Sequence, residues 1–224
     1  MSMTVQALRD YVRTHLDTDS TELPDSLLDV YMNEGIDQIA RASERWSFYE
    51  DLWTFSSVKG QRAYPLDSLD PTIDVVTSVQ GPRWRLDPHS HEWAQEQFQW
   101  SNWTSQPRYW TRWADSLYLW PTPSSVQTIT IRGYRKPVAP SGASATPDLP
   151  GEMHDLVGSF MLARAYAHQD DEVMADRFRQ DFEQGLSRFR KRYESARRGG
   201  TRTIGGNRRS PFARASGRLI FPWE

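Results

Sequence analysis

The stretch that most constrains the fold is residues 107–137, because it has the pattern of β-structure and lies between segments with helical patterns. Residues 108–114 are rich in aromatic side chains, which suit a pleated, half-buried surface. Asp115-Ser116 predicts a tight turn, after which residues 117–120 return as a short strand. Residues 126–135 alternate between two kinds of side chain, as a half-buried strand does. We therefore expect one compact antiparallel meander at the centre of the chain.

Apolar residues recur at helical spacing on both sides of this stretch. They predict two helices before it, over residues 4–16 and about 24–44, and two after it, over residues 148–168 and about 172–194. A short connection between two amphipathic helices makes them antiparallel neighbours. The sequence thus predicts a mainly α protein with a β insertion (an α+β fold), in which an antiparallel, strand-rich insertion interrupts a four-helix bundle.

The same patterns divide the chain into five segments. Residues 1–45 form the first helix pair and residues 46–138 form the β insertion. Residues 139–147 are a linker of small side chains, and residues 148–194 form the second helix pair. Residues 195–224 have no periodicity and are interpreted as an extended basic arm.

One short helix is expected inside the insertion. Strands over residues 73–79 and 83–86 precede it. Asp87 as the N-cap residue and Pro88 at the first helical position predict a helix that runs to about Phe98.

The formal net charge of -2 hides an asymmetry between the body and the arm. From Ser195 onward the chain carries seven of its 27 basic residues and one of its 29 acidic residues, a balance of +6. The remaining 20 basic and 28 acidic residues give the body a balance of -8. A basic arm with an apolar end is typical of a segment that folds onto a partner. Its residues of interest are Arg197, Arg198, Arg202, Arg208, Arg209, Arg214, Arg218, Leu219, Ile220, Phe221 and Trp223.

No pattern in the sequence indicates an enzyme or a bound metal. The chain has no Cys, and therefore no thiolate zinc site and no cysteine nucleophile. His89-Ser90-His91-Glu92 is the most metal-like cluster, but residues two apart do not share a helix face, so a polar first helical turn is the better interpretation. His154 and His168 lie at predicted helix ends, where a structural role suits them. We expect no catalytic residue, no cofactor and no metal.

The sequence also gives no sign of a membrane protein. No segment approaches the roughly 18 apolar residues that a membrane span needs, and the first residues lack the pattern of a signal peptide. The absence of Cys is compatible with a reducing compartment. We expect a soluble protein that assembles inside the cell.

The ten Trp residues allow two interpretations. They provide either a stacking platform for sugars or bases, or the core of the insertion and a subunit interface. The second interpretation is favoured because large aromatic side chains dominate the energetics of burial. We assign Trp110, Trp113, Tyr118 and Trp120 to the core or to an interface. The residues that the first interpretation would use are Trp84, Trp93, Trp100, Trp103, Trp110 and Trp113.

The order of these parts resembles the head-to-tail adaptor proteins (connector or head-completion proteins) of tailed bacteriophages. The resemblance rests on residues 109–123, YWTRWADSLYLWPTP, and residues 129–137, ITIRGYRKP. Residues 148–150, DLP, followed by residues 153–157, MHDLV, fit the return to helix in the same family. These motifs are structural and not catalytic.

The resemblance implies a structural virion protein that assembles in the host cytoplasm. Such adaptors form a ring, typically of twelve copies, in the neck under the portal, where they extend the DNA channel and present a surface for the next neck or tail component. Their C-terminal arms contact the portal protein, which assigns that role to the arm, especially Arg208, Arg209, Arg214, Phe221 and Trp223. Genomic DNA passes through the channel without sequence-specific binding, and no membrane is involved.

An alternative function belongs to another class. In this reading the chain is a nucleic-acid- or carbohydrate-binding module, which uses the Trp-rich insertion for recognition and the basic tail for affinity.

Overall fold

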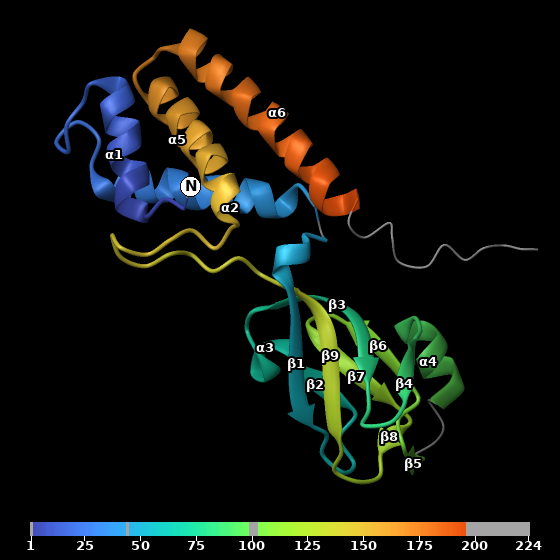
Figure 1. Ribbon diagram of the computed structural model, residues 1–224. Helices are drawn as coiled ribbons and strands as arrows, with labels where there is room; N and C mark the ends of the chain where they lie inside the picture. The colour runs from blue at the N-terminus through green and yellow to red at the C-terminus, as the bar shows by residue number, and fades with distance from the viewer. Residues whose placement is uncertain (1, 44, 99–102, 196–224) are drawn as a thin grey trace, which may run out of the picture.

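Four long helices gather at one end of the molecule in Figure 1, and a curled sheet with two short helices forms the other end. This computed structural model describes residues 2–43, 45–98 and 103–195. The described part of the chain is a mixed α/β protein with six α-helices and one large sheet. The mixture of helices with a strand-rich middle segment is therefore confirmed.

The helical region has α5 at its centre. Its helices are α1 (Val5–Leu16), α2 (Asp25–Arg41), α5 (His154–His168) and α6 (Glu172–Ser195), and the 3-10 turn η2 (Gly151–Met153) leads into α5. Helix α5 packs against each of the other three, most extensively against α6. Leu8, Ile39 and Met161 are fully buried in their common core. The specific prediction of a four-helix bundle is not confirmed, because α2 runs across α5 in Figure 1 and not alongside it.

Helix α1 begins where the sequence predicts. The Thr4 hydroxyl accepts a backbone N–H of the first turn at 3.2 Å, as an N-cap residue does. The N–H groups of Val5 and Gln6 have no partner within the helix. They donate to the carbonyls of Ala145 and Ala143 at 2.8 and 3.0 Å. The small-residue segment before α5 therefore satisfies donors that a helix start leaves unpaired.

The sheet region contains seven strands in the order β1-β9-β3-β4-β6-β7-β2. Its core includes Val79, Leu86, Leu117, Leu119 and Ile129, all fully buried. A separate parallel pair of short strands, β5 with β8, lies beside the sheet. The bounds are β1 (Glu50–Ser56), β2 (Ala63–Pro65), β3 (Ile73–Gln80), β4 (Arg85–Pro88), β5 (Thr104–Ser105), β6 (Tyr109–Trp113), β7 (Ser116–Trp120), β8 (Thr122–Pro123) and β9 (Thr128–Arg135), with η1 (Ser47–Tyr49), α3 (Leu66–Leu69) and α4 (His91–Phe98) between them.

The predicted three-stranded meander is wrong in one respect. Strands β6 and β7 do form an antiparallel hairpin, whose turn is Ala114-Asp115, one residue earlier than predicted. The third strand, β9, instead pairs with β1 and β3, in the other half of the sheet. Its alternation is as predicted, since Ile129 and Ile131 are fully buried. Local alternation shows which face of a strand is buried but not which strand lies beside it.

The predicted start of the short helix is also wrong. Asp87 and Pro88 belong to β4 and pair in parallel with Tyr109 and Trp110 of β6. Helix α4 begins three residues after Pro88, where the Ser90 hydroxyl accepts the N–H of Trp93 at 3.2 Å. An N-cap residue followed by Pro is a local signal, and here the pairing of two strands overrides it.

Candidate interaction surfaces

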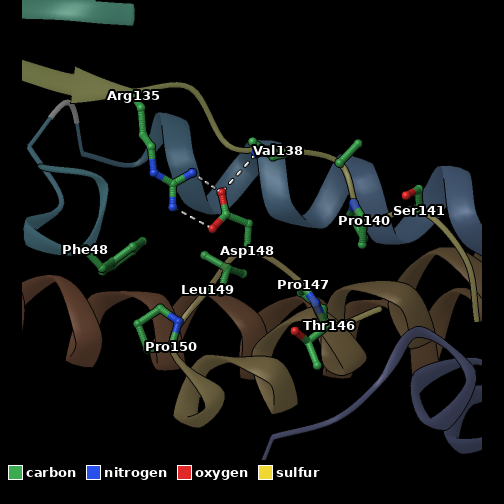
Figure 2. Close-up of a pocket in the computed structure, with 11 residues that line it drawn as sticks. Phe48, Arg135, Val138, Pro140, Ser141, Thr146, Pro147, Asp148, Leu149 and Pro150 are labelled. Atoms are coloured by element: carbon green, nitrogen blue, oxygen red, sulfur yellow. Dashed lines mark hydrogen bonds and ion pairs between the residues drawn. The ribbon is translucent and has the colours of Figure 1, made fainter. Parts of the chain in front are cut away.

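The chain passes between the two regions at a waist, which consists of residues 42–43, 45–49 and 136–150. At the waist Arg135, the last residue of β9, forms an ion pair with Asp148 (Figure 2). Both terminal nitrogens of Arg135 donate to this carboxylate, one of them at 2.7 Å. The carboxylate also accepts the N–H of Val138 at 3.0 Å. The Asp148 side chain therefore links the two ends of the segment 138–148 and holds them beside the last residue of β9.

The surroundings keep the two partners of this pair charged. Burial raises the pKa of Asp148, but hydrogen bonds from Arg135 and from the Val138 N–H outweigh burial and hold that pKa below its ordinary value. The hydrogen bonds to Asp148 raise the pKa of Arg135. Arg135 also lies 5.3 Å from the centre of the Tyr49 ring, and burial raises the pKa of the Tyr49 hydroxyl. This arrangement suits a structural clamp and not proton transfer.

Two open hollows flank the waist and share Arg135 as a wall. The hollow in Figure 2 has a volume of about 420 Å³ and lies between Phe48 and the segment of residues 138–150. The other, of about 490 Å³, lies between α2 and residues 134–137. Both hollows are therefore lined by residues that connect the helical region to the sheet region.

The hairpin of β6 and β7 has one face in the core and one face under α4. Trp110 is opposite Leu119 and lies in the sheet core, with 7% of its surface exposed. Trp120 is opposite Tyr109 on the other face and is also buried. Its indole N–H donates to the hydroxyl of Thr111 at 3.1 Å. Trp110 and Trp120 are therefore buried by residues of the same chain, on opposite faces of the same hairpin.

Trp113 and Tyr118 extend the second face of the hairpin toward solvent. Trp113 is 53% exposed and stacks on His91 of α4 at a ring distance of 5.1 Å. Tyr118 is partly buried and meets His91 edge to face at 4.7 Å. The Arg62 guanidinium lies over the Trp120 ring at 4.1 Å. These side chains and Gln95 line a hollow of about 480 Å³, which is a candidate binding surface of the insertion.

The two histidines of the segment 89–92 face different neighbours. His89 stacks on Trp93 at 3.8 Å, whereas His91 turns inward to Thr111, so the two rings point to different neighbours. Burial lowers the pKa of His91, which favours its neutral form. The described residues hold no group of three His, Cys, Asp or Glu side chains that fits a metal ion. No helix within the described ranges is long and apolar enough to cross a membrane.

Helix α6 presents an apolar stripe that the rest of the described chain covers incompletely. Phe182 is buried against Phe160 of α5, with the ring centres 5.2 Å apart. Phe178, Leu186 and Phe189 pack on the same core and remain partly exposed. This face is a second candidate interaction surface.

The arm residues singled out in the sequence, from Arg197 to Trp223, lie outside the described residues, as does Trp100. The structure instead reveals residues that the sequence reasoning did not single out as a site, namely Arg62, Tyr49 and the Arg135–Asp148 pair. Arg135 ends a strand and Asp148 precedes a helix, 13 positions later in the sequence. Nothing in the local sequence of either residue predicts that they contact each other.

The sequence matches the family described as SU10 adaptor protein over residues 3–208. No curated protein matches it. The match spans both helix pairs and the whole insertion, the parts that carry the resemblance to phage adaptors. The chain therefore belongs to the SU10 adaptor protein family and is a structural component of a bacteriophage virion.

Proposed function

We propose that this chain is the subunit of a head-to-tail adaptor ring that docks under the portal, extends the DNA channel and provides the attachment surface for the tail. The observation that carries the proposal is the family match over residues 3–208, which includes nearly all of the described structure. The protein acts without catalysis and without a cofactor, and it resides in the virion neck after assembly in the host cytoplasm.

Contacts between neighbouring copies use the last two helices and the exposed edges of the insertion. Support comes from the partly exposed stripe of α6, because an apolar stripe left half-covered in one copy is suited to burial by another. A ring needs two different faces on each copy, and cyclic symmetry closes it. Twelve copies is the number that the family resemblance implies.

The arm contacts the portal protein. Arg208, Arg209 and Arg214 would meet acidic groups of the portal, while Phe221 and Trp223 would fill an apolar groove. The channel surface is acidic and repels DNA phosphates, so the genome slides without sequence-specific binding. The balance of -8 outside the arm supports this assignment. A ring whose channel is lined by basic side chains would refute the sliding argument.

Electron microscopy of the full chain mixed with purified portal tests the proposal. We expect an additional ring of density on the face of the portal that points away from the capsid. Portal particles without added density, at protein concentrations where both components are soluble, would overturn the assignment. A portal from an unrelated phage serves as the control for unspecific adhesion.

One observation favours a second candidate function, binding of sugars or single-stranded nucleic acid by the insertion. Trp113 offers an exposed indole face beside Arg62, the combination that stacks on flat ligands. This function predicts quenching of Trp fluorescence by sugars, or tight and salt-dependent binding of oligonucleotides, by the isolated chain. The adaptor function predicts neither.

A further inference from the structure

Strand β1 is one edge of the seven-stranded sheet, and its outer side has backbone groups without a strand partner among the described residues. The N–H of Ser57 donates to the carbonyl of Gln127 at 2.8 Å, which fixes the alternation of the ladder between β1 and β9. The backbone groups of Leu52, Thr54 and Ser56 therefore point away from β9.

The side chain of Asp51 confirms the outward direction. Its carboxylate accepts the N–H of Leu52 at 2.7 Å, which is possible only if that N–H does not bond β9. No described residue provides a backbone partner for the outward groups of Thr54 and Ser56. Strand β1 thus presents an extended template of donors and acceptors.

The two edges of the sheet differ in how they are protected. Strand β2 at the opposite edge has three residues and ends in Pro65, which cannot donate a ladder hydrogen bond. Strand β1 has seven residues and no Pro, and Leu52 on it is 50% exposed. A long edge of this kind attracts another strand unless something covers it. The β1 edge is therefore the better suited of the two to accept a further strand.

The described chain ends close to where β1 begins. The ring of Tyr193, near the end of α6, lies 5.3 Å from the ring of Phe48 and 6.1 Å from that of Trp46. Phe48 precedes the first residue of β1 by two positions. The described chain thus ends near the segment that leads into β1.

The sequence after Ser195 matches this edge in charge and in residue type. Arg197 and Arg198 come first, and β1 opens with the exposed acids Glu50 and Asp51. Residues 201–204, TRTI, lie between two Gly-Gly pairs and contain the Thr and Ile side chains that favour strands.

The chain after α6 is long enough for residues 201–204 to reach the middle of β1. The strand from Glu50 to Thr54 spans about 13 Å, and the eight residues from the end of α6 at Ser195 to Thr203 span up to about 26 Å when extended.

We infer that residues 201–204 add to the free edge of β1 in the same chain as a further strand of the sheet, with Arg197 and Arg198 beside Glu50 and Asp51. The added strand runs parallel to β1, because α6 descends to the waist and β1 leaves it in the same direction (Figure 1). The remainder of the arm, from Gly205 onward, then departs near the far end of the sheet. This inference requires neither a ring nor a portal, but it removes the β1 edge from the edges of the insertion that a neighbouring copy could contact.

Disulfide formation tests the placement directly, since the natural chain has no Cys that would interfere. Full-length protein with Thr54→Cys and Thr203→Cys should form an intrachain disulfide in high yield under mild oxidation, identified by peptide mass spectrometry. The matched control, Thr77→Cys with Thr203→Cys, uses an exposed Thr on β3, two strands away from the edge, and should give at least tenfold less. Equal yields would overturn the inference.

The same cysteines show whether the strand at the β1 edge comes from the same chain or from a neighbouring copy. If mixing the Thr54→Cys and Thr203→Cys single variants gives cross-linked dimers in preference to the intrachain product, the segment of a neighbouring copy occupies the edge, and the assignment to the same chain is wrong. If neither product forms, the edge has another partner and the inference fails.

Hydrogen exchange provides a second test, with substitutions that lie only in the arm. Thr203→Pro removes a donor and disfavours strand pairing in the added segment, whereas Ser216→Pro changes a position outside it. We expect the amides of Thr54 and Ser56, whose outward N–H groups have no partner among the described residues, to exchange at least tenfold faster in Thr203→Pro than in Ser216→Pro, while the Trp53 amide, which faces β9, is unaffected. Identical exchange of Thr54 in both variants would contradict the added strand.

Discussion

The carboxylate of Asp148 accepts hydrogen bonds from Arg135 and so joins the end of β9 to the segment that returns to the helices. This pair lies between two separate hydrophobic cores, one inside the helical region and one inside the sheet. The core of the helical region extends into the waist, where Trp46 and Tyr49 are buried together with Tyr134 of β9, so the ion pair adds a polar clamp to this packing.

Asp148→Asn should lower the free energy of unfolding. The Asn side chain removes the charge opposite Arg135, and a hydrogen bond to a charged group contributes about 1.5–3 kcal/mol. Because Asp148 is 25% exposed, we expect the lower part of this range. Chemical denaturation followed by far-UV circular dichroism measures the change. Asp181→Asn, on the exposed side of α6, is the matched control and should shift stability by less than about 0.5 kcal/mol.

The same pair predicts a pH dependence. The pKa of Asp148 in the folded protein lies below its unfolded value, so its contribution is complete above the unfolded pKa and is lost as the pH falls through the folded pKa. The stability difference between wild type and Asp148→Asn should therefore be largest near neutral pH and shrink below about pH 4. Denaturant titrations of both proteins at several pH values measure this difference. A difference that stays constant down to pH 2 would show that Asp148 gains nothing from its charge.

The hydrophobic patterns were sufficient to predict the four long helices but not the short ones or the arrangement of the strands. Helix α1 begins after Thr4 as predicted, because an N-cap and an amphipathic stripe are both local signals. The partners of β9 could not be predicted, since alternation of Ile129 and Ile131 is equally compatible with any neighbouring strand. His154 shows the same limit. It was assigned to a helix end, but it accepts the Met3 N–H at 2.8 Å across 151 residues of sequence.

The candidate surfaces could be predicted only in part. Aromatic enrichment pointed to the hairpin, yet it did not separate Trp110 and Trp120, which are buried, from Trp113, which is half exposed. The strand register and the cover provided by α4 decide that difference. Arg62 gave no signal at all, because its role depends on a ring contact with Trp120 that is 58 positions away in the sequence.

Trp120→Ala and Trp113→Ala should differ sharply in stability although both residues lie on the same hairpin. Trp120 is 2% exposed and donates to Thr111, so its truncation leaves a cavity and should cost about 3–5 kcal/mol. Trp113 is 53% exposed, and its truncation should cost less than about 1 kcal/mol. Thermal denaturation of the two variants compares them. Equal destabilisation would show that Trp113 also belongs to the core.

Gly133→Ala should destabilise the sheet strongly. A Cβ at this position would lie 1.9 Å from the carbonyl oxygen of Val75, which is backbone of β3 and cannot move aside without shifting the strand. Overpacking of this kind costs about 1–3 kcal/mol or more. Gly60→Ala is the control, because the space around Gly60 is open and only its positive φ opposes the change, at about 1 kcal/mol. Soluble yield and denaturation midpoints rank the two variants, and a Gly133→Ala protein as stable as Gly60→Ala would contradict the close approach of β3 and β9.

Replacement of arm arginines should weaken docking on the portal without changing the fold. In the proposed function Arg208, Arg209 and Arg214 face acidic groups of the portal, and exposed charge pairs contribute about 0.2–1 kcal/mol each. The triple change to Gln should therefore lower affinity roughly threefold to a hundredfold and make binding less sensitive to salt.

Co-sedimentation with purified portal at several salt concentrations measures both effects. The matched control replaces three exposed arginines of the sheet region, Arg83, Arg85 and Arg132, with Gln and removes the same charge from the body. A control that weakens docking as much as the arm variant would mean that net charge alone attracts the portal, and the arm would lose its assigned role. If only the arm variant loses affinity and salt sensitivity, the basic arm is the portal contact. Its attachment would then depend on the charges of these arginines.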